Sequence, residues 1–138
     1  MKLIHKFKSP NFDERKSKKI SFIIIHYTAL KSVSKSINFL CLKKNQVSAH
    51  YVISRNGEIY SLVSEKKRAW HAGDSYWNGI KDINSYSIGI ELDYSANNLN
   101  EEYAEKQIKS LLKLLLKIKE KYSLNSKNIL GHSDMLHI

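Results

Sequence analysis

The feature that most constrains the fold is the apolar, mostly β-branched run at residues 20–26, which reads Ile-Ser-Phe-Ile-Ile-Ile-His. Its apolar residues are nearly continuous and do not alternate with polar ones, so the run predicts a strand that is buried on both faces. Strands of this kind belong to sheets that are covered by helices. This segment therefore predicts the centre of an α/β domain.

Two helices are predicted from the spacing of apolar residues, one over residues 31–43 and a longer amphipathic one over residues 99–122. Residues 72–85, rich in Gly, Asp, Asn and aromatic side chains, are expected to form a long surface loop. The other strands are predicted at residues 49–55, 58–63, 68–71, 86–93 and 128–131. The predicted fold is α/β, with a central mixed β-sheet flanked by helices.

The dipeptide Asn56-Gly57 joins two of these strands and is the strongest short hairpin signal, since both residues tolerate a positive φ. Residues 1–19 form a charged, proline-containing leader, and residues 20–138 are expected to be a single domain. At 138 residues the chain is the size of one ordinary domain.

Composition excludes several classes of protein. No stretch approaches the ~18 to 20 consecutive apolar residues of a membrane span, so no membrane association is expected. The amino terminus does not resemble a secretory signal, and a cytoplasmic location follows by default. The single cysteine, Cys41, excludes an internal disulfide and a cysteine-rich zinc cluster. We expect a monomer.

The net charge of +10 raises the possibility of a nucleic-acid partner. Only 3 of the 23 basic residues are Arg, however, and Arg is the residue that bidentate recognition of phosphates and guanine edges favours. The lysines are also spread along the whole chain. We therefore expect a solvated basic surface and no nucleic-acid partner.

Three polar side chains, His26, Glu91 and His132, each follow an apolar strand segment, and strand ends can aim such groups at one point. Taken singly, each has an ordinary explanation. A histidine at a strand end is more often a hydrogen-bonded, partly buried side chain than a metal ligand, and a glutamate on a half-exposed strand can point to solvent. If Glu91 is buried, however, its pKa rises toward the range of a general base.

Five short phrases of the chain carry further information. They are Phe-Ile-Ile-Ile-His-Tyr-Thr at 22–28, Ser-Ala-His-Tyr-Val-Ile at 48–53, Ala-Trp-His-Ala-Gly at 69–73, Ser-Ile-Gly-Ile-Glu-Leu at 87–92 and Gly-His-Ser-Asp at 131–134. In this order and at this spacing they resemble the motifs of the type 2 family of N-acetylmuramoyl-L-alanine amidases. The resemblance covers nearly the whole chain from about residue 20.

The resemblance implies a zinc hydrolase that cuts the amide between the lactyl group of N-acetylmuramic acid and L-alanine of the peptide stem. His26 and His132 match two of the family's zinc ligands, and Glu91 matches its acid/base residue. The chemistry is coherent, because a catalytic zinc needs three protein ligands and an open position for water. The expected cofactor is Zn²⁺, and the expected ligands are peptidoglycan fragments, either muropeptides or anhydro-muropeptides.

Four residues match the loop that, in the family, helps to form the wall of the substrate groove. These are Trp70, His71, Trp77 and Asn84. Aromatic and polar side chains together suit a ligand that combines sugar faces with peptide amides. Core packing is the alternative role for Trp70. By the same resemblance His50 is a supporting residue and not a zinc ligand.

The family's last motif continues past His-Ser-Asp to an aspartate that is the third zinc ligand, and this position falls beyond Ile138. The domain is therefore expected to lack the family's C-terminal segment and to hydrolyse slowly or not at all. Asp134 and His137 are the candidates for replacing the lost ligand. The alternative function is a non-catalytic module, or a decaying remnant, that binds peptidoglycan fragments.

Overall fold

The computed structural model describes residues 1–28, 30, 32–73, 75–77, 79–94, 104–131 and 136–137, with only the backbone described for 75–77 and 136–137. Its centre is a six-stranded mixed sheet. In spatial order the strands are β1 (Leu3–Ile4), β5 (Ile59–Ser61), β4 (Tyr51–Ile53), β9 (Ser87–Leu92), β3 (Phe22–Tyr27) and β10 (Ile129–Gly131). All neighbouring pairs are parallel except the β4–β5 hairpin.

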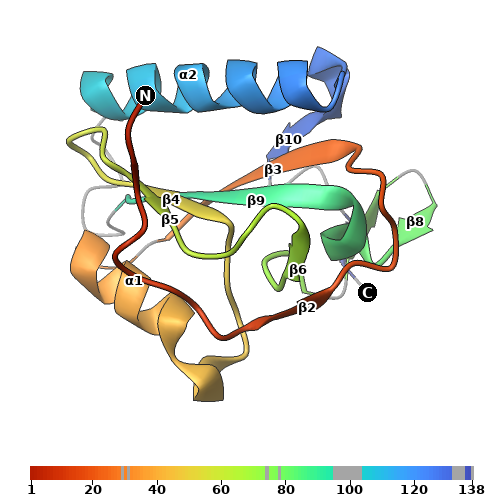
Figure 1. The fold of residues 1–138 in the computed structure, drawn as a ribbon, viewed down its shortest axis with the longest axis horizontal. Helices are drawn as coiled ribbons and strands as arrows, with labels where there is room; N and C mark the ends of the chain where they lie inside the picture. The colour runs from red at the N-terminus through yellow and green to blue at the C-terminus, as the bar shows by residue number, and fades with distance from the viewer. Residues whose placement is uncertain are drawn as a thin grey trace.

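Two helices cover opposite faces of this sheet, α2 (Glu105–Lys121) on one and α1 (Val33–Cys41) on the other (Figure 1). Both were predicted from their apolar spacing, as was the mixed sheet between them, and these predictions are confirmed. Ser32 caps α1, because its side chain accepts a hydrogen bond from the backbone of Lys35. The predicted start of the second helix is wrong, since Ala104 is extended and the described helix begins at Glu105.

The alternation of side chains along the central strands divides the core between the two faces. Ile23, Ile88 and Ile90 point toward α2 and pack with its Leu114 and Ile118. On the opposite face one cluster gathers around α1, and another gathers around η2, a 3₁₀ turn at Ile83–Tyr86. These buried apolar contacts fix the register of the sheet, and the register places the polar residues at the strand ends.

The hairpin predicted at Asn56-Gly57 is confirmed: β4 and β5 pair antiparallel, and Gly57 has a φ of 85°. The loop predicted at residues 72–85 contains more regular structure than expected. It holds the strands β7 (Ser75–Trp77) and β8 (Ile80–Lys81), which pair with each other, and the start of η2. Strands of two or three residues leave too little sequence for a period to be recognised.

The N-terminal leader also contains strands that sequence reasoning missed. β1 pairs with β5 at the edge of the main sheet, and β2 (Phe12–Glu14) pairs with β6 (Lys67–Ala69). β11 (Leu136–His137) pairs with β7. The described 3₁₀ turns are η1 (Lys43–Asn45), η2 and η4 (Ser126–Asn128).

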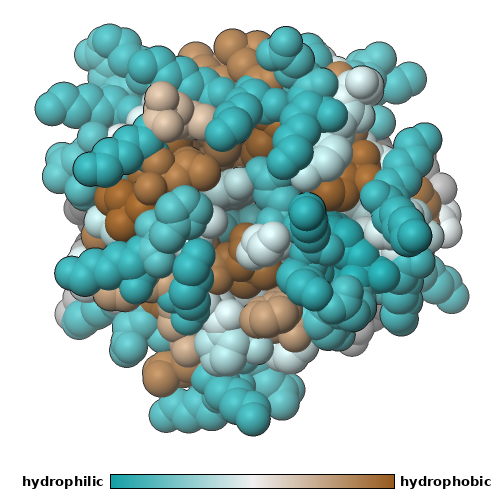
Figure 2. All heavy atoms as spheres, viewed as in Figure 1, coloured by the Kyte–Doolittle hydropathy of each residue, from teal (hydrophilic) through white to brown (hydrophobic). Residues whose placement is uncertain are grey.

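Hydrophilic side chains project from all parts of the face shown in Figure 2, between smaller apolar patches. No helix in the described part of the chain is long and apolar enough to cross a membrane.

Candidate functional site

His26 and Glu91 lie side by side at the carboxyl ends of β3 and β9. The two residues are register partners in this parallel pair, so their side chains lie on the same face of the sheet, the face that α1 covers. Both side chains are buried, with exposed fractions of 6% and 8%. β10 lies on the other side of β3, and its last residue, Gly131, pairs with Ile25, directly before His26.

Glu91 borders a cavity of about 230 Å³ between the end of β3 and α1. Burial raises the pKa of its carboxyl to about 8. A carboxyl group that titrates near neutral pH can take up and release a proton under physiological conditions, as a general acid/base must. The other residues that line the cavity are Tyr27, Thr28, Leu30, Ser36, Phe39, Leu40 and Val47.

His26 contacts a second histidine from a distant part of the chain. Its Nε2 lies 3.0 Å from Nδ1 of His71, and Nε2 of His71 lies 3.0 Å from Oγ of Ser87, the first residue of β9. Burial lowers the pKa of His71 well below its usual value, so its imidazole is neutral at pH 7. The two rings meet edge to face, at a centroid distance of 5.2 Å.

The space for His71 depends on a glycine. An added Cβ at Gly89 would lie 2.4 Å from Cγ of His71, closer than two such carbons can approach. Ser87, Gly89 and Glu91 alternate along β9 and therefore share one face of the sheet. The sequence motif contains all three residues, but sequence reasoning assigned a role to Glu91 alone. The period-two spacing was the signal that could have identified the other two.

His50 supports this arrangement from the opposite side of His71. Its Nδ1 accepts a hydrogen bond from the backbone N–H of Gly89, and its Nε2 donates to the carbonyl of Lys67 over 2.8 Å. Burial is the main cause that lowers the pKa of His50 to about 4, so the ring is neutral. Both ring nitrogens are engaged with the backbone, which suits a structural role.

The four expected groove residues separate into different environments. His71 is buried, with an exposed fraction of 7% and its ring beside His26, and its role in a groove wall stays a prediction. Asn84 is also buried, and its Oδ1 accepts hydrogen bonds from the backbone N–H groups of His71 and Ala72. Trp70 is half-buried and borders an open pocket of about 340 Å³. Trp77 lies in β7, where only its backbone is described.

The described residues contain one of the expected zinc ligands, His26. His132 and Asp134 lie outside the described residues, and so does the side chain of His137. Within the described part of the chain, no group of three or more His, Cys, Asp or Glu side chains is placed to hold a metal ion. His26 itself fits a zinc site, because it is a buried imidazole at the carboxyl end of β3 and is the register partner of Glu91.

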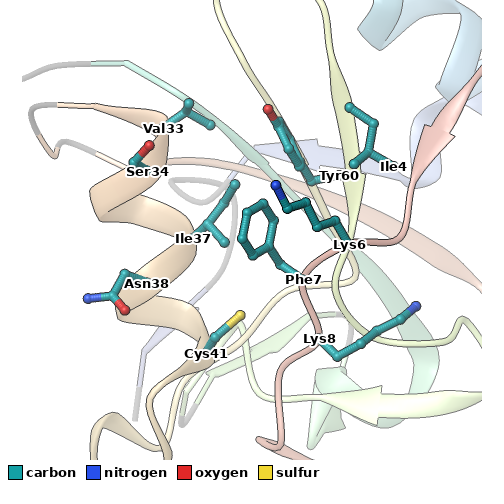
Figure 3. Close-up of a pocket in the computed structure, with 10 residues that line it drawn as sticks. All are labelled: Ile4, Lys6, Phe7, Lys8, Val33, Ser34, Ile37, Asn38, Cys41 and Tyr60. Atoms are coloured by element: carbon teal, nitrogen blue, oxygen red, sulfur yellow. The ribbon is translucent and has the colours of Figure 1, made fainter.

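A larger cavity, of about 610 Å³, lies on the other flank of α1 (Figure 3). It is bounded by the N-terminal segment, by α1 and by Tyr60, and the ring of Phe7 points into it toward Ile37. It shares no lining residue with the cavity that Glu91 borders. Cavity size alone therefore does not locate the site, and His26 and Glu91 stay the predicted site residues.

Comparison with known proteins identifies the family. The family model described as N-acetylmuramoyl-L-alanine amidase (Amidase_2) matches residues 16–137, nearly the whole chain. The chain belongs to this amidase family. Among curated members, the 1,6-anhydro-N-acetylmuramyl-L-alanine amidase AmpD of Haemophilus influenzae is 35% identical to this chain. The aligned region covers 92% of this chain and 78% of the AmpD chain. AmiD of Escherichia coli is 33% identical over 85% of this chain, which spans about half of AmiD (46%).

Solved structures of amidases share the fold. A crystal structure of an AmpD derivative superposes with a TM-score of 0.80 at 27% identity, covering 96% of this chain and 82% of that one. AmiD of E. coli, solved with the substrate anhydro-N-acetylmuramic acid-L-Ala-D-γ-Glu-L-Lys, gives a TM-score of 0.76 at 32% identity, covering 84% of this chain and 49% of that one. The family and the mixed-sheet architecture expected from the sequence motifs are thus confirmed.

Proposed function

We propose that this amidase hydrolyses the amide bond between N-acetylmuramic acid and L-alanine in peptidoglycan fragments, in cell-wall turnover or muropeptide recycling, with Zn²⁺ as its cofactor. The observation that carries the proposal is the register pairing of His26 with Glu91 at the ends of two parallel strands, beside a cavity. Family membership supplies the reaction class. A cytoplasmic location and a monomeric state stay predictions from the sequence.

His26 and His132 are the proposed metal ligands of this chain, and Asp134 or His137 is the candidate for the third position. When bound, Zn²⁺ would lower the pKa of a bound water to ~7 and polarise the scissile carbonyl. Glu91 accepts the proton of the attacking water and delivers it to the leaving nitrogen, so that the products are a carboxylic acid and a free amine. Burial raises its pKa to about 8 in the metal-free protein, which favours the carboxyl group holding the proton between the two transfers.

The proposed substrate is a fragment with a muramic acid residue and a short peptide. AmiD is solved with an anhydro-muramyl tripeptide, and AmpDh3 of Pseudomonas aeruginosa, 33% identical over 87% of this chain, with an anhydromuramic pentapeptide. The cavity beside Glu91 mixes aromatic, aliphatic and hydroxyl side chains, which suits a ligand with apolar and polar faces. Trp70 and Trp77 are proposed to extend this surface along the groove.

The proposal is tested by loading the protein with zinc and measuring the release of peptides with a free L-alanine amine from an anhydro-muropeptide. Replacing Glu91 by Gln should lower the rate by ~10² to 10⁴-fold, because the amide keeps the shape of the side chain but cannot transfer the proton. Asp93→Asn is the matched control, since this buried carboxylate on the same segment does not border the cavity. Its rate should stay within a few-fold of the wild type.

The protein could instead bind the fragment without binding zinc or hydrolysing the amide. That result would reject the enzyme and support the alternative function, a binding module. In that case Glu91→Gln would leave the affinity for the fragment unchanged.

A further inference from the structure

The imidazole of His71 is held at both ends by polar partners. Its Nδ1 lies 3.0 Å from Nε2 of His26, and its Nε2 lies 3.0 Å from Oγ of Ser87. All three side chains are buried. Hydrogen bonds that are closed off from water are directional and costly to leave unmade, so this series constrains the protons of both rings.

The donor and acceptor of each hydrogen bond follow from the partner of Ser87, the last side chain of the series. The hydroxyl of Ser87 donates to the backbone carbonyl of Ile83 over 2.8 Å, and a carbonyl can only accept. Ser87 Oγ therefore accepts from the Nε2–H of His71. A neutral imidazole with its proton on Nε2 has an accepting lone pair on Nδ1, so the proton between the two rings belongs to His26 Nε2.

The surroundings of His71 prevent its ring from turning. Asn84 Oδ1 binds the backbone N–H of His71 over 3.2 Å, and the ring lies against the bare backbone of Gly89. Arg15 in turn donates to the backbone carbonyls of Asn84 and Ser85. The ring is thus held by His26, Ser87 and Gly89, while Asn84 holds the backbone of His71 and Arg15 holds the segment of Asn84.

We propose that His71, anchored by Ser87, is a positioning residue that holds His26 as its Nε2–H tautomer, so that a metal bound by this ring is bound through Nδ1. This inference rests on the proposed function, because it assigns His26 to the zinc site. A ligating imidazole must present an unprotonated nitrogen, and an outer partner that fixes the tautomer and the ring orientation strengthens metal binding. Neither Ser87 nor His71 touches the metal in this arrangement.

The competing explanation is that His71 only fills space over Gly89. Two substitutions separate the explanations. His71→Leu keeps an apolar side chain in the space but offers no acceptor to His26. His71→Asn places a carbonyl oxygen close to the position of Nδ1, so it can restore the hydrogen bond.

Two measurements report on positioning rather than on activity. The tautomer of His26 is read from the ¹⁵N chemical shifts of its imidazole in the metal-free protein, and zinc affinity is measured by competition with a chromophoric chelator. The wild type should show the Nε2–H tautomer. His71→Leu should lose this single tautomer and bind zinc ~10 to 100-fold more weakly, and His71→Asn should recover most of both.

A milder pair of variants covers the case in which His71→Leu does not fold. Ser87→Ala removes the partner of His71 Nε2 and should lower zinc affinity several-fold while leaving a mixture of His26 tautomers. Ser54→Ala is the control, because Ser54 is also buried but its hydroxyl accepts from the backbone N–H of Glu58 in the β4–β5 turn and not from His71. Its tautomer and affinity should match those of the wild type.

The outcomes are distinguishable. A wild-type ring in the Nδ1–H form, or His71→Leu and Ser87→Ala proteins that keep both the tautomer and the zinc affinity, would overturn the positioning role. A wild-type protein that binds no zinc would refute the proposed function and the role toward the metal, and the tautomer in the metal-free protein would then decide whether His71 orients His26 at all.

Discussion

At the scale of single residues, the burial of Glu91 links the site to stability. The folded state raises the pKa of this carboxyl from 4.5 to about 8, so the folded protein holds a proton that the unfolded chain releases between these pH values. Stability is therefore lost as the pH rises through this window. Ionising the buried Glu91 carboxyl therefore destabilises the folded protein, although the same burial gives the group a pKa near neutral.

Replacing Glu91 by Gln should remove this cost in the metal-free protein. The stability of the variant relative to wild type should increase by roughly 3 kcal/mol between pH 5.5 and pH 8.5, since one pKa unit corresponds to about 1.4 kcal/mol. Urea unfolding at both pH values measures the difference, and other titrating groups cancel in the comparison. A stability difference that does not change with pH would show that Glu91 is not buried in the charged state.

Sequence reasoning at this scale singles out His26, Glu91 and His132, each of which follows an apolar strand. It expects His71 in a groove wall and gives Ser87 and Gly89 no role. His26 and Glu91 carry a signal because a hydrophobic run stops at them. His71 carries no such signal, since its environment depends on how its segment folds back over Gly89, a contact between positions far apart in the chain. Local patterns cannot encode a contact of that kind, whereas the period-two spacing of Ser87, Gly89 and Glu91 is visible in the sequence.

At the scale of elements, α2 does more than cover the sheet. Gln107 is fully buried in its apolar face, and its Nε2 donates to the carbonyls of Ile53 and Asp93, both at 3.0 Å. These carbonyls lie where β4 and β9 end, and the Ile53 carbonyl also accepts from the N–H of Asp93. The helix thereby supplies hydrogen-bond donors at the carboxyl ends of β4 and β9, the end of the sheet at which Glu91 lies.

Gln107→Leu should therefore destabilise the protein although it adds apolar surface to the core. The Asp93 carbonyl loses this donor, and a buried acceptor without a partner costs about 1 to 3 kcal/mol. The matched control is Lys113→Leu on the exposed side of α2, which should change stability by less than about 0.5 kcal/mol. Chemical denaturation measures both variants. If the Gln107 variant is as stable as the control, the two hydrogen bonds contribute nothing net.

Long periodic elements were predictable and short ones were not. The helices and the central strands bury one face or two over many residues, so their periodicity is visible in the sequence. β2, β7 and β8 span two or three residues, too few to show a period, and each pairs with another short strand. The start of α2 was also missed, because Ala104 favours a helix by propensity but adopts an extended backbone in this context.

At the scale of the whole molecule, the leader binds the domain at several separate points. Asn11 Nδ2 donates to the carbonyls of Leu40 and Leu42 at the C-terminal end of α1 and to the carbonyl of Val47, beyond η1. Ser9 Oγ also donates to the Leu40 carbonyl. The expected boundary at residue 19 therefore separates segments that are joined by buried hydrogen bonds.

Arg15 extends these contacts to the site. Its guanidinium donates to the carbonyls of Glu65, Asn84 and Ser85. Desolvation by burial is the main cause that lowers the pKa of Arg15 to about 10, which still leaves the group charged at neutral pH. Through Asn84, which binds the backbone of His71, the leader thus contributes to the placement of the rings around His26.

Removing residues 1–15 should destabilise the whole domain by more than about 3 kcal/mol, even though the family match begins at residue 16. The deletion removes the side-chain donors of several backbone carbonyls, at about 1 kcal/mol or more for each lost bond. Among these are the carbonyls of Leu40, Leu42, Val47, Asn84 and Ser85. Removing residues 1–5 is the control: it deletes β1 but keeps Ser9, Asn11 and Arg15, and should cost about 1 kcal/mol. Urea unfolding measures both deletions, and equal stabilities would mean that the side-chain contacts of the leader do not hold the fold together.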